Sequence, residues 1–185
     1  MEEGKEGKRQ MLFVDASHFV HSPFLGKVWC KTRVFIKSPS GRKRHNVLGA
    51  FNAINHELIR VENDDYVNAI TVIELIKKIH SYYGGQKITL IMDNARYQRC
   101  AAVMEYAREC DIELLFLPPY SPNLNLIERL WKFVKKNALN SIYYENFDLF
   151  KEGIDDCLKN LGTKFKTQVQ SLMSLKFQIF HNETL

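Results

Sequence analysis

The fold of this chain is decided by residues 117–132, which read LPPYSPNLNLIERLWK. The apolar run 112–117 leads into this stretch, and the prolines that follow cannot donate to a β ladder, so a strand must end there. Behind the prolines, apolar side chains recur at helical spacing, at Leu124, Ile127, Leu130, Trp131 and Val134. We therefore expect a helix with Ser121 as N-cap and Pro122 as its first residue, carrying Glu128 beside its apolar face.

Two aspartates end two other apolar runs. Asp15 follows the run 11–14, MLFV, and Asp93 follows the run 88–92, ITLIM. The end of a buried strand is a costly place for a bare carboxylate, so each aspartate needs a partner. Taken alone, each acid could be an ordinary surface residue at the end of an element. Together with Glu128 they predict a divalent-metal site, because hard cations prefer oxygen ligands.

Three strings closely resemble the catalytic core of DDE transposases: FVD at 13–15, IMDNA at 91–95 and LPPYSPNLNLIE at 117–128. The nearest group is the mariner-like superfamily, which includes many bacterial insertion-sequence transposases. Its gap of 34 residues between the second aspartate and the glutamate is also the gap here. The resemblance covers about residues 11–140. It departs from the family at Ala16, where many members carry an acid, and at Leu126, where proline is common.

This resemblance implies a ribonuclease H-like fold and an enzyme that cuts transposon ends and joins them to target DNA. Asp15, Asp93 and Glu128 would be its catalytic residues and would hold Mg²⁺ or Mn²⁺, as two ions that flank an in-line displacement. The implied partners are the DNA of the ends and of the target, and a second copy of the chain in the active complex. Two alternatives stay open: a ribonuclease H-like nuclease without strand transfer, and an inactive remnant that only binds DNA.

Seven cationic side chains are candidates for contacts with DNA phosphates: Lys37, Arg42, Lys43, Arg44, Lys132, Lys135 and Lys136. The first four surround a turn signalled by SPSG at 38–41, where they could equally keep an exposed edge soluble. The last three follow Glu128 and are the better candidates. Arg96 and Arg99 follow Asp93, and an exposed helix face explains them slightly better than phosphate binding.

Other polar and aromatic residues near the acids have competing interpretations. Asn94 and Asn125 could orient the acids through hydrogen bonds, although capping or turn roles fit them equally well. His18 and His21 form an H-x-x-H pair. This pair indicates a transition-metal site only weakly, because neither a thiol nor a third imidazole accompanies it. The two tryptophans, one of which is Trp131, are more often core residues than stacking platforms.

Composition indicates an ordinary globular protein. The 185 residues are 45% hydrophobic and 25% charged, and the net charge of +5 is a mild indication of a polyanionic partner. The four cysteines form no CxxC pair, which argues against a zinc ribbon and for reduced thiols. The absence of a GxxxxGK[ST] loop excludes a P-loop nucleotide hydrolase. With no apolar leader and no 18-residue apolar run, we expect a cytoplasmic protein, nucleoid-associated if bacterial.

Hydrophobic periodicity predicts an α/β fold with a five-stranded mixed sheet flanked by helices. The expected strands are 11–14, 29–37, 46–54, 87–92 and 112–116. The first three follow one another without a helix, so we expect an antiparallel meander in which the second and third form a hairpin. The last two are separated by helices and should be parallel. The expected helices are 65–83, 95–110, 122–140 and 147–161.

We expect a charged lead-in at 1–10, a catalytic domain at 11–140, and a helical extension of the same domain at 141–185. Family members usually carry helix-turn-helix modules before the first aspartate, and fourteen residues precede Asp15 here. Recognition of element ends is therefore expected to need a helix-turn-helix segment fused upstream or supplied by a partner. The end sequence and the target preference cannot be read from these residues.

Overall fold

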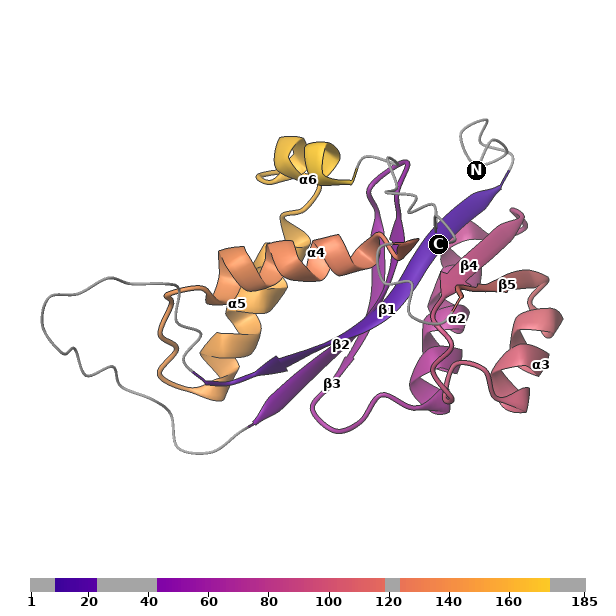
Figure 1. Ribbon diagram of the computed structural model, residues 1–185, viewed down its shortest axis with the longest axis horizontal. Helices are drawn as coiled ribbons and strands as arrows, with labels where there is room; N and C mark the ends of the chain where they lie inside the picture. Colours follow the sequence, from indigo (N-terminus) through magenta and orange to yellow (C-terminus); the bar gives the residue numbers. More distant parts are fainter. Residues whose placement is uncertain (1–8, 23–42, 119–123, 174–185) are drawn as a thin grey trace, which may run out of the picture.

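The apolar segment around Asp15 forms the middle strand of the molecule (Figure 1). The computed structural model describes residues 9–22, 43–118 and 124–173. Its sheet has the order β3-β2-β1-β4-β5, and its strands are β1 Gln10–Val20, β2 Arg44–Asn52, β3 Leu58–Asn63, β4 Ile88–Met92 and β5 Ile112–Phe116. β1, β2 and β3 are antiparallel neighbours, whereas β1, β4 and β5 run parallel. The expected mixed sheet, with antiparallel strands first and parallel strands after, is confirmed.

Helices cover both faces of this sheet (Figure 1). They are α2 Ala69–Tyr83, α3 Ala101–Glu109, α4 Ile127–Val134, α5 Phe147–Lys159 and α6 Lys166–Leu172, and the π-helical turn η2 Lys135–Leu139 continues α4. Side chains alternate between the faces of a strand. Leu12 and Val14 of β1 therefore pack with α2 and α3, while Phe13 and Phe19 pack with α4 and α5.

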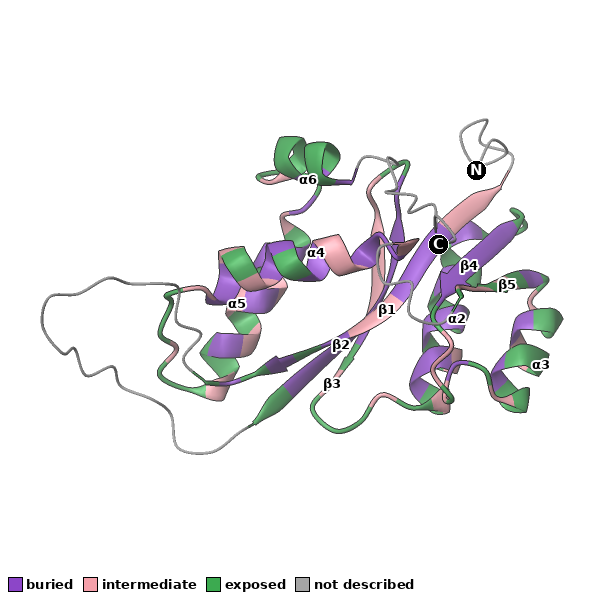
Figure 2. Cartoon of the chain, viewed as in Figure 1, coloured by how far each residue is buried: buried purple, intermediate pink, exposed green. Residues whose placement is uncertain are grey.

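One buried cluster joins α5, which follows residue 140, to the sheet. Phe150, Ile154 and Leu158 of α5 lie in one buried cluster with Phe13 and Trp131. Figure 2 shows that α4 and α5 each carry buried and exposed residues, and the buried ones belong to this cluster. Within the described ranges, no helix is long and apolar enough to cross a bilayer.

The expected hairpin between strands 29–37 and 46–54 is wrong. β2 pairs with β1 along one edge and with β3 along the other, so it has no free edge for a further partner. The range 29–37 lies outside the described residues. The strand that does form the hairpin, β3, was not predicted. Its turn is built by Asn52, whose Oδ1 accepts from the Ile54 N–H at 2.9 Å, and by His56, whose φ is 64°.

Two helices begin later than expected, and for α2 a side-chain cap gives the reason. α2 starts after Asn68, whose side chain accepts from the Thr71 backbone N–H at 3.1 Å while the Thr71 hydroxyl accepts from the Asn68 N–H. α3 starts after Cys100 rather than at Ala95. The segment between Asp93 and α3 is consequently a series of turns, which places Tyr97 and Gln98 near the end of β4.

Candidate active site

Asp15 is the most enclosed of the three candidate acids. It lies within β1 directly after the buried residues Phe13 and Val14, and it is paired across the sheet with Gly49 of β2. Burial raises the pKa of Asp15 to about 7; the backbone N–H of Ala16 opposes this shift, and the nearby negative charges of Asp93 and Glu128 add to it. The chain therefore holds a carboxylate where only a positive partner would make its charge favourable.

The parallel register explains why Asp93 lies close to Asp15. Val14 of β1 is paired with Met92 of β4, so the two aspartates are the next residues at the same end of adjacent parallel strands. Asp93 is exposed there, since β4 ends at Met92. The two aspartates therefore differ in exposure, because Asp15 is enclosed within β1 and Asp93 is exposed at the edge of the sheet.

Glu128 completes the group from the first turn of α4. Burial raises its pKa, Lys132 one turn further along the helix opposes this, and Asp93 adds to it. The structure thus brings together the three acids, each of which feels the charge of another. The helix starts at Ile127, with Leu126 at the N-cap position, so the expected start at Ser121 and Pro122 is wrong. Residues 119–123 lie outside the described ranges.

Two asparagines hold the segments that carry these acids. The side-chain N–H of Asn125 donates to the Val14 carbonyl at 3.2 Å, which joins the entry of α4 to β1. The side-chain N–H of Asn94 donates to the Leu117 carbonyl at 2.5 Å, which joins the end of β4 to the end of β5. Both asparagines bind backbone, so they position the elements rather than the carboxylates themselves. The bond from Asn125 also gives a reason for the late start of α4, because it ties a residue two positions before the helix to β1.

Buried polar atoms without partners gather around Asp15. In the described part of the chain, these atoms belong to Ser17, Gln98, Asn125 and Trp131. Ser17 shares a strand face with Asp15, and Gln98 adjoins Tyr97, whose pKa burial and the charges of Asp93 and Asp15 raise to about 12. Each unmade bond of this kind costs about 1–3 kcal/mol. Such groups are expected where a protein binds a polar or charged ligand.

The donor set fits a hard divalent cation. All three acids are carboxylates, and a cation between them would offset the burial and the weaker mutual repulsion that raise the pKa of Asp15 and of Glu128. Within 9–22, 43–118 and 124–173, no three His, Cys, Asp or Glu side chains stand close enough to form a ready-made metal cluster.

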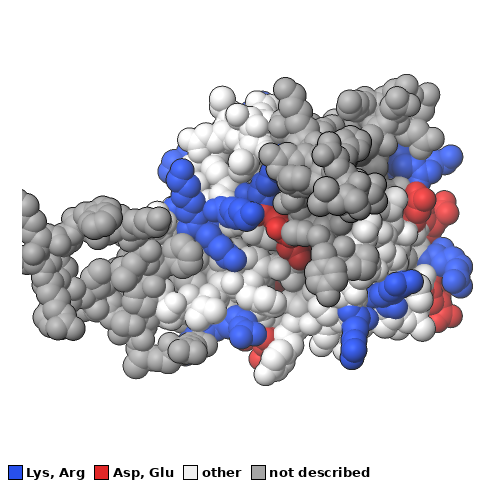
Figure 3. Space-filling view, viewed as in Figure 1, with Lys and Arg blue, Asp and Glu red and all other residues white. Residues whose placement is uncertain are grey.

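The candidate DNA-binding cations fall into two separate groups. Lys132 and Lys136 are exposed, and Lys136 lines a groove of about 810 Å³ beside α4 and α6. The ammonium of Lys135 lies 5.7 Å from the centre of the Phe19 ring. In Figure 3, a group of Lys and Arg side chains lies beside Asp and Glu side chains on one face. Lys132 acts directly on Glu128, and Lys135 and Lys136 follow it along the chain in the π-helical turn η2.

The cations at the start of β2 lie at the far end of the sheet. Arg44 is paired with Val20, five residues along the ladder from the pair of Asp15 and Gly49, which is roughly 16 Å at 3.3 Å per residue. Lys43 lies with its ammonium 5.5 Å from the centre of the Phe147 ring. Lys37 and Arg42 lie outside the described residues. Lys43 and Arg44 are thus separated from the acids.

The histidines after Asp15 have structural partners instead of forming a metal site. His18 Nδ1 is 2.6 Å from Asn46 Oδ1, and His21 Nε2 is 3.1 Å from the Tyr144 carbonyl. The ring of His21 also lies 5.1 Å from that of Phe150. The guanidinium of Arg99 packs over the Phe116 ring at 5.7 Å, but Arg96 and Arg99 lie in the turns before α3, so the expected helix face is wrong for both.

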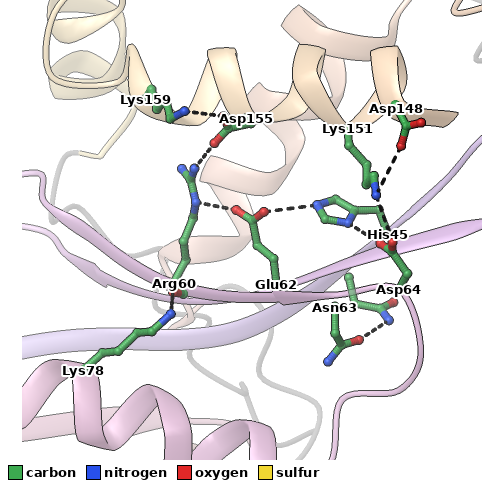
Figure 4. Close-up of polar contacts among 11 residues, drawn as sticks. His45, Arg60, Glu62, Asn63, Asp64, Lys78, Asp148, Lys151, Asp155 and Lys159 are labelled. Atoms are coloured by element: carbon green, nitrogen blue, oxygen red, sulfur yellow. Dashed lines mark hydrogen bonds and ion pairs between the residues drawn. The ribbon is translucent and has the colours of Figure 1, made fainter. Parts of the chain in front are cut away.

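A second cluster of ionisable groups lies between β2, β3 and α5 (Figure 4). His45 Nδ1 is 2.8 Å from Asp64, which also binds Lys151 at 3.1 Å. Arg60 pairs with Asp155 of α5. Every acid named here is matched by a cation or imidazole of the chain itself, so this cluster fastens α5 to the sheet and offers no open ligand set.

Sequence reasoning missed three residues at the site: Gly49, Gln98 and Trp131. Trp131 could have been found by its spacing, because a residue three after Glu128 lies on the same side of a helix. Gln98 follows Asp93 closely in sequence but gives no local signal of burial. Gly49 becomes meaningful only through its pairing with Asp15.

Comparison with known proteins agrees with this geometry. Residues 10–151 match the family described as DDE superfamily endonuclease. A curated relative, the uncharacterized protein y4pE/y4sA of Sinorhizobium fredii, is 42% identical over 38 residues, which are 20% of this chain and 28% of that protein.

Similar solved structures show the same fold. The Mos1 transposase paired-end complex with left transposon end has a TM-score of 0.63 at 15% identity, covering 96% of this chain and 60% of that chain. The catalytic domain of Mos1 mariner transposase has a TM-score of 0.56 at 14% identity, covering 93% of this chain and 84% of that chain. The sheet and its helices therefore have the ribonuclease H-like fold. Because the family match spans most of the chain and includes all three acids, the chain belongs to the DDE superfamily endonuclease family.

Proposed function

We propose that this chain is the catalytic domain of a DDE transposase, which cleaves DNA at transposon ends and transfers the cut strand into target DNA. The observation that carries the proposal is the convergence of Asp15, Asp93 and Glu128 from β1, β4 and α4. Family membership supports it, as do the similar Mos1 structures, whose titles name transposon ends and a strand transfer complex.

Asp15, Asp93 and Glu128 would hold Mg²⁺ or Mn²⁺, and structures of Mos1 have been determined with each of these metals. When bound, two such ions activate a water or a 3′-hydroxyl and stabilise the leaving oxygen in an in-line displacement. The protein contributes rigid placement. Asp15 is fixed within a strand, and Asn94 and Asn125 fasten the other two acids' segments to the sheet. The exposed side of Asp93 leaves access for a DNA backbone.

The cations after Glu128 are the proposed contacts with that backbone. Lys132, Lys135 and Lys136 occupy α4 and the π-helical turn, directly beyond the acid in the first turn. The chain spans 60% of the length of the Mos1 chain, so the partners of the whole protein are a further part of the proposal. They are a second copy of the chain in the active complex, and a helix-turn-helix segment that recognises element ends.

The test is cleavage and joining in vitro, on DNA that carries candidate element ends, with Mg²⁺ and with EDTA. Asp15→Asn, Asp93→Asn and Glu128→Gln should each lower cleavage by about a thousandfold or more, because each removes a charge that the reaction centre requires. Asp15→Asn should not lower the thermal midpoint, since it removes a buried charge that faces two others. Circular dichroism of each variant is the control for folding.

The outcomes separate the alternatives. Cleavage without joining of a pre-cut end would support the plain nuclease, and DNA binding without cleavage in any metal would support the inactive remnant. Full activity after exhaustive chelation would contradict the metal-dependent mechanism. A variant that keeps near-native activity would remove its residue from the site.

A further inference from the structure

Trp131 lies in a slot beside Asp15 that a glycine leaves open. Its side chain, 4% exposed, comes from α4, one turn after Glu128. A Cβ added to Gly49 would lie 2.9 Å from Cη2 and 3.0 Å from Cζ2 of the indole, so no larger residue fits there without a shift. Gly49 is the residue paired with Asp15, and directly paired residues present the same face of a sheet. The indole therefore lies on the face into which the Asp15 side chain projects.

The indole N–H lies on the same face as the Asp15 carboxylate, within its reach. Among the described residues this buried N–H has no partner in normal hydrogen-bond geometry, yet it lies close enough to Asp15 to lower the pKa of that carboxylate. An indole nitrogen can only donate, and an ionised carboxylate can only accept. A small adjustment of either side chain would complete the bond. Phe19 restrains the indole, with its ring edge-on at 6.3 Å between ring centroids.

The other groups near Asp15 favour the same pairing. The backbone N–H of Ala16 also donates to Asp15, while Asp93 and Glu128 repel it. The carboxylate thus has N–H donors of the protein close to it and two acids whose charges repel its own. Without a donor to hold it, a carboxylate between two like charges would turn away from them.

We propose that Trp131 is a positioning residue whose indole N–H holds one oxygen of Asp15, so that the other oxygen faces Asp93 and Glu128. This inference rests on the proposed function, in which Asp15 is a metal ligand. Groups that orient metal ligands typically contribute ten- to a hundredfold to metal affinity. Gly49 has a supporting part, because it provides the space in which the indole reaches Asp15.

The test replaces Trp131 with 3-benzothienylalanine, in which sulfur takes the place of the N–H in a ring of nearly the same shape. The affinity for Mg²⁺, measured by calorimetry, should fall by about tenfold or more, while the circular dichroism spectrum stays unchanged. Phe19→Leu is the matched control: it loosens the packing of the indole and keeps the N–H, so its loss of affinity should be smaller. The ¹⁵N–¹H resonance of the Trp131 indole is assigned with Trp131→Phe. It should move when Mg²⁺ is added to the native protein, and adding Mg²⁺ to the Asp15→Asn variant should leave it in place.

The results distinguish this inference from the function on which it rests. If the native protein binds no Mg²⁺, the proposed metal site is overturned and the inference with it. If the native protein binds Mg²⁺ and the sulfur isostere binds it within about twofold as tightly, only the role of Trp131 is overturned. The role of Trp131 would also be overturned if its indole resonance has the same position with and without Mg²⁺, and in the native protein and the Asp15→Asn variant. This result counts even if the isostere should fold poorly.

Discussion

The absence of a side chain at Gly49 determines how closely α4 approaches the sheet. The nearest atoms to an added Cβ would be two ring carbons of Trp131 and Cδ1 of Leu58, all between 2.9 and 3.0 Å away. These atoms belong to rigid or packed groups in the core shared by β2, β3 and α4. A methyl group at this position must therefore move the helix or the indole.

Gly49→Ala should destabilise the fold by about 1–3 kcal/mol, the usual cost of overpacking a well-filled core. The free energy of unfolding can be measured by urea denaturation. Gly162→Ala is the matched control, because a Cβ there meets nothing within 4 Å. Equal stability of the two variants would mean that α4 adjusts without cost, and the close fit of Trp131 would lose its significance.

At the scale of single elements, α4 combines a buried face with a cationic one. Ile127, Leu130, Trp131 and Val134 are buried, while Lys132 and Lys136 are exposed. With an acid at its start and cations further along, this helix can bind a metal and a phosphate backbone from one rigid element. The cations at the start of β2 lack this placement, because Arg44 is paired with Val20 at the other end of the ladder.

Replacing Lys132 and Lys136 together with alanine should flatten the slope of log affinity against log salt concentration by about 1–2 units, as expected when one or two phosphate contacts are lost. DNA affinity at a series of salt concentrations gives this slope. Lys43→Ala with Arg44→Ala removes the same charge from the distant end of β2, and its slope should stay close to the native value. The reverse result would place the DNA at β2.

The ion pairs between α5 and the sheet lead to a second prediction for single elements, which concerns the dependence of stability on pH. His45, whose side chain is 5% exposed, lies between Glu62 and Asp64 (Figure 4). Burial lowers the pKa of His45, but the bonds to these two acids outweigh it, and the net shift is upward. Because the pKa of His45 is higher in the folded protein, its protonated ring stabilises the fold. This stabilisation is fully present below about pH 6.5, the pKa in the unfolded chain, and is lost as the pH rises through the pKa in the folded protein.

The free energy of unfolding should therefore show a contribution from His45 that decreases over the pH range above about 6.5, as the pH rises through the folded pKa. His45→Gln should remove this contribution, so its loss of stability relative to the native protein should be greater at the lower end of this range than at the upper end. Urea denaturation across the range measures it. The double variant Glu62→Gln, Asp64→Asn should lose the same pH dependence, because it removes the acids that raise the pKa. A difference that grows as the pH rises would contradict the assignment.

At the scale of the whole molecule, the acids lie where the two halves of the sheet meet. Asp15 belongs to β1, which is antiparallel to β2 and parallel to β4, so the site lies at the change of direction. The candidate cations among the described residues lie on α4 and its π-helical turn or at the far end of β2, where they would meet DNA backbone. Specific recognition of an end needs base-edge contacts, usually from a helix in the major groove.

We therefore expect this chain by itself to bind DNA with little sequence preference, in the micromolar range or weaker at physiological salt. A competition assay, with a labelled element end against unrelated duplex of equal length, measures the preference. A ratio above about a hundredfold would show that the chain carries its own sequence readout. The segment after residue 140 would then be the place to look for it.

The three acids and the helix faces could be predicted from the sequence because their signals are local. Asp15 and Asp93 each end an apolar run, and Glu128 follows a string that is specific to its family. The same local signals gave the order of antiparallel and parallel strands. They could not give β3 as the partner of β2, because pairing depends on which segments meet across the sheet, and the turn at Asn52 has no strong glycine or proline signal.

The sequence by itself therefore determined which residues carry the proposed chemistry, and only the tertiary structure decided how they are supported. The slot at Gly49, the approach of Trp131 to Asp15 and the bond from Asn125 to Val14 all join residues far apart in the chain. The separation of Arg44 from the acids likewise follows from the ladder register. Such contacts are set by register and packing, which depend on the whole sheet and leave no pattern in any short stretch of sequence.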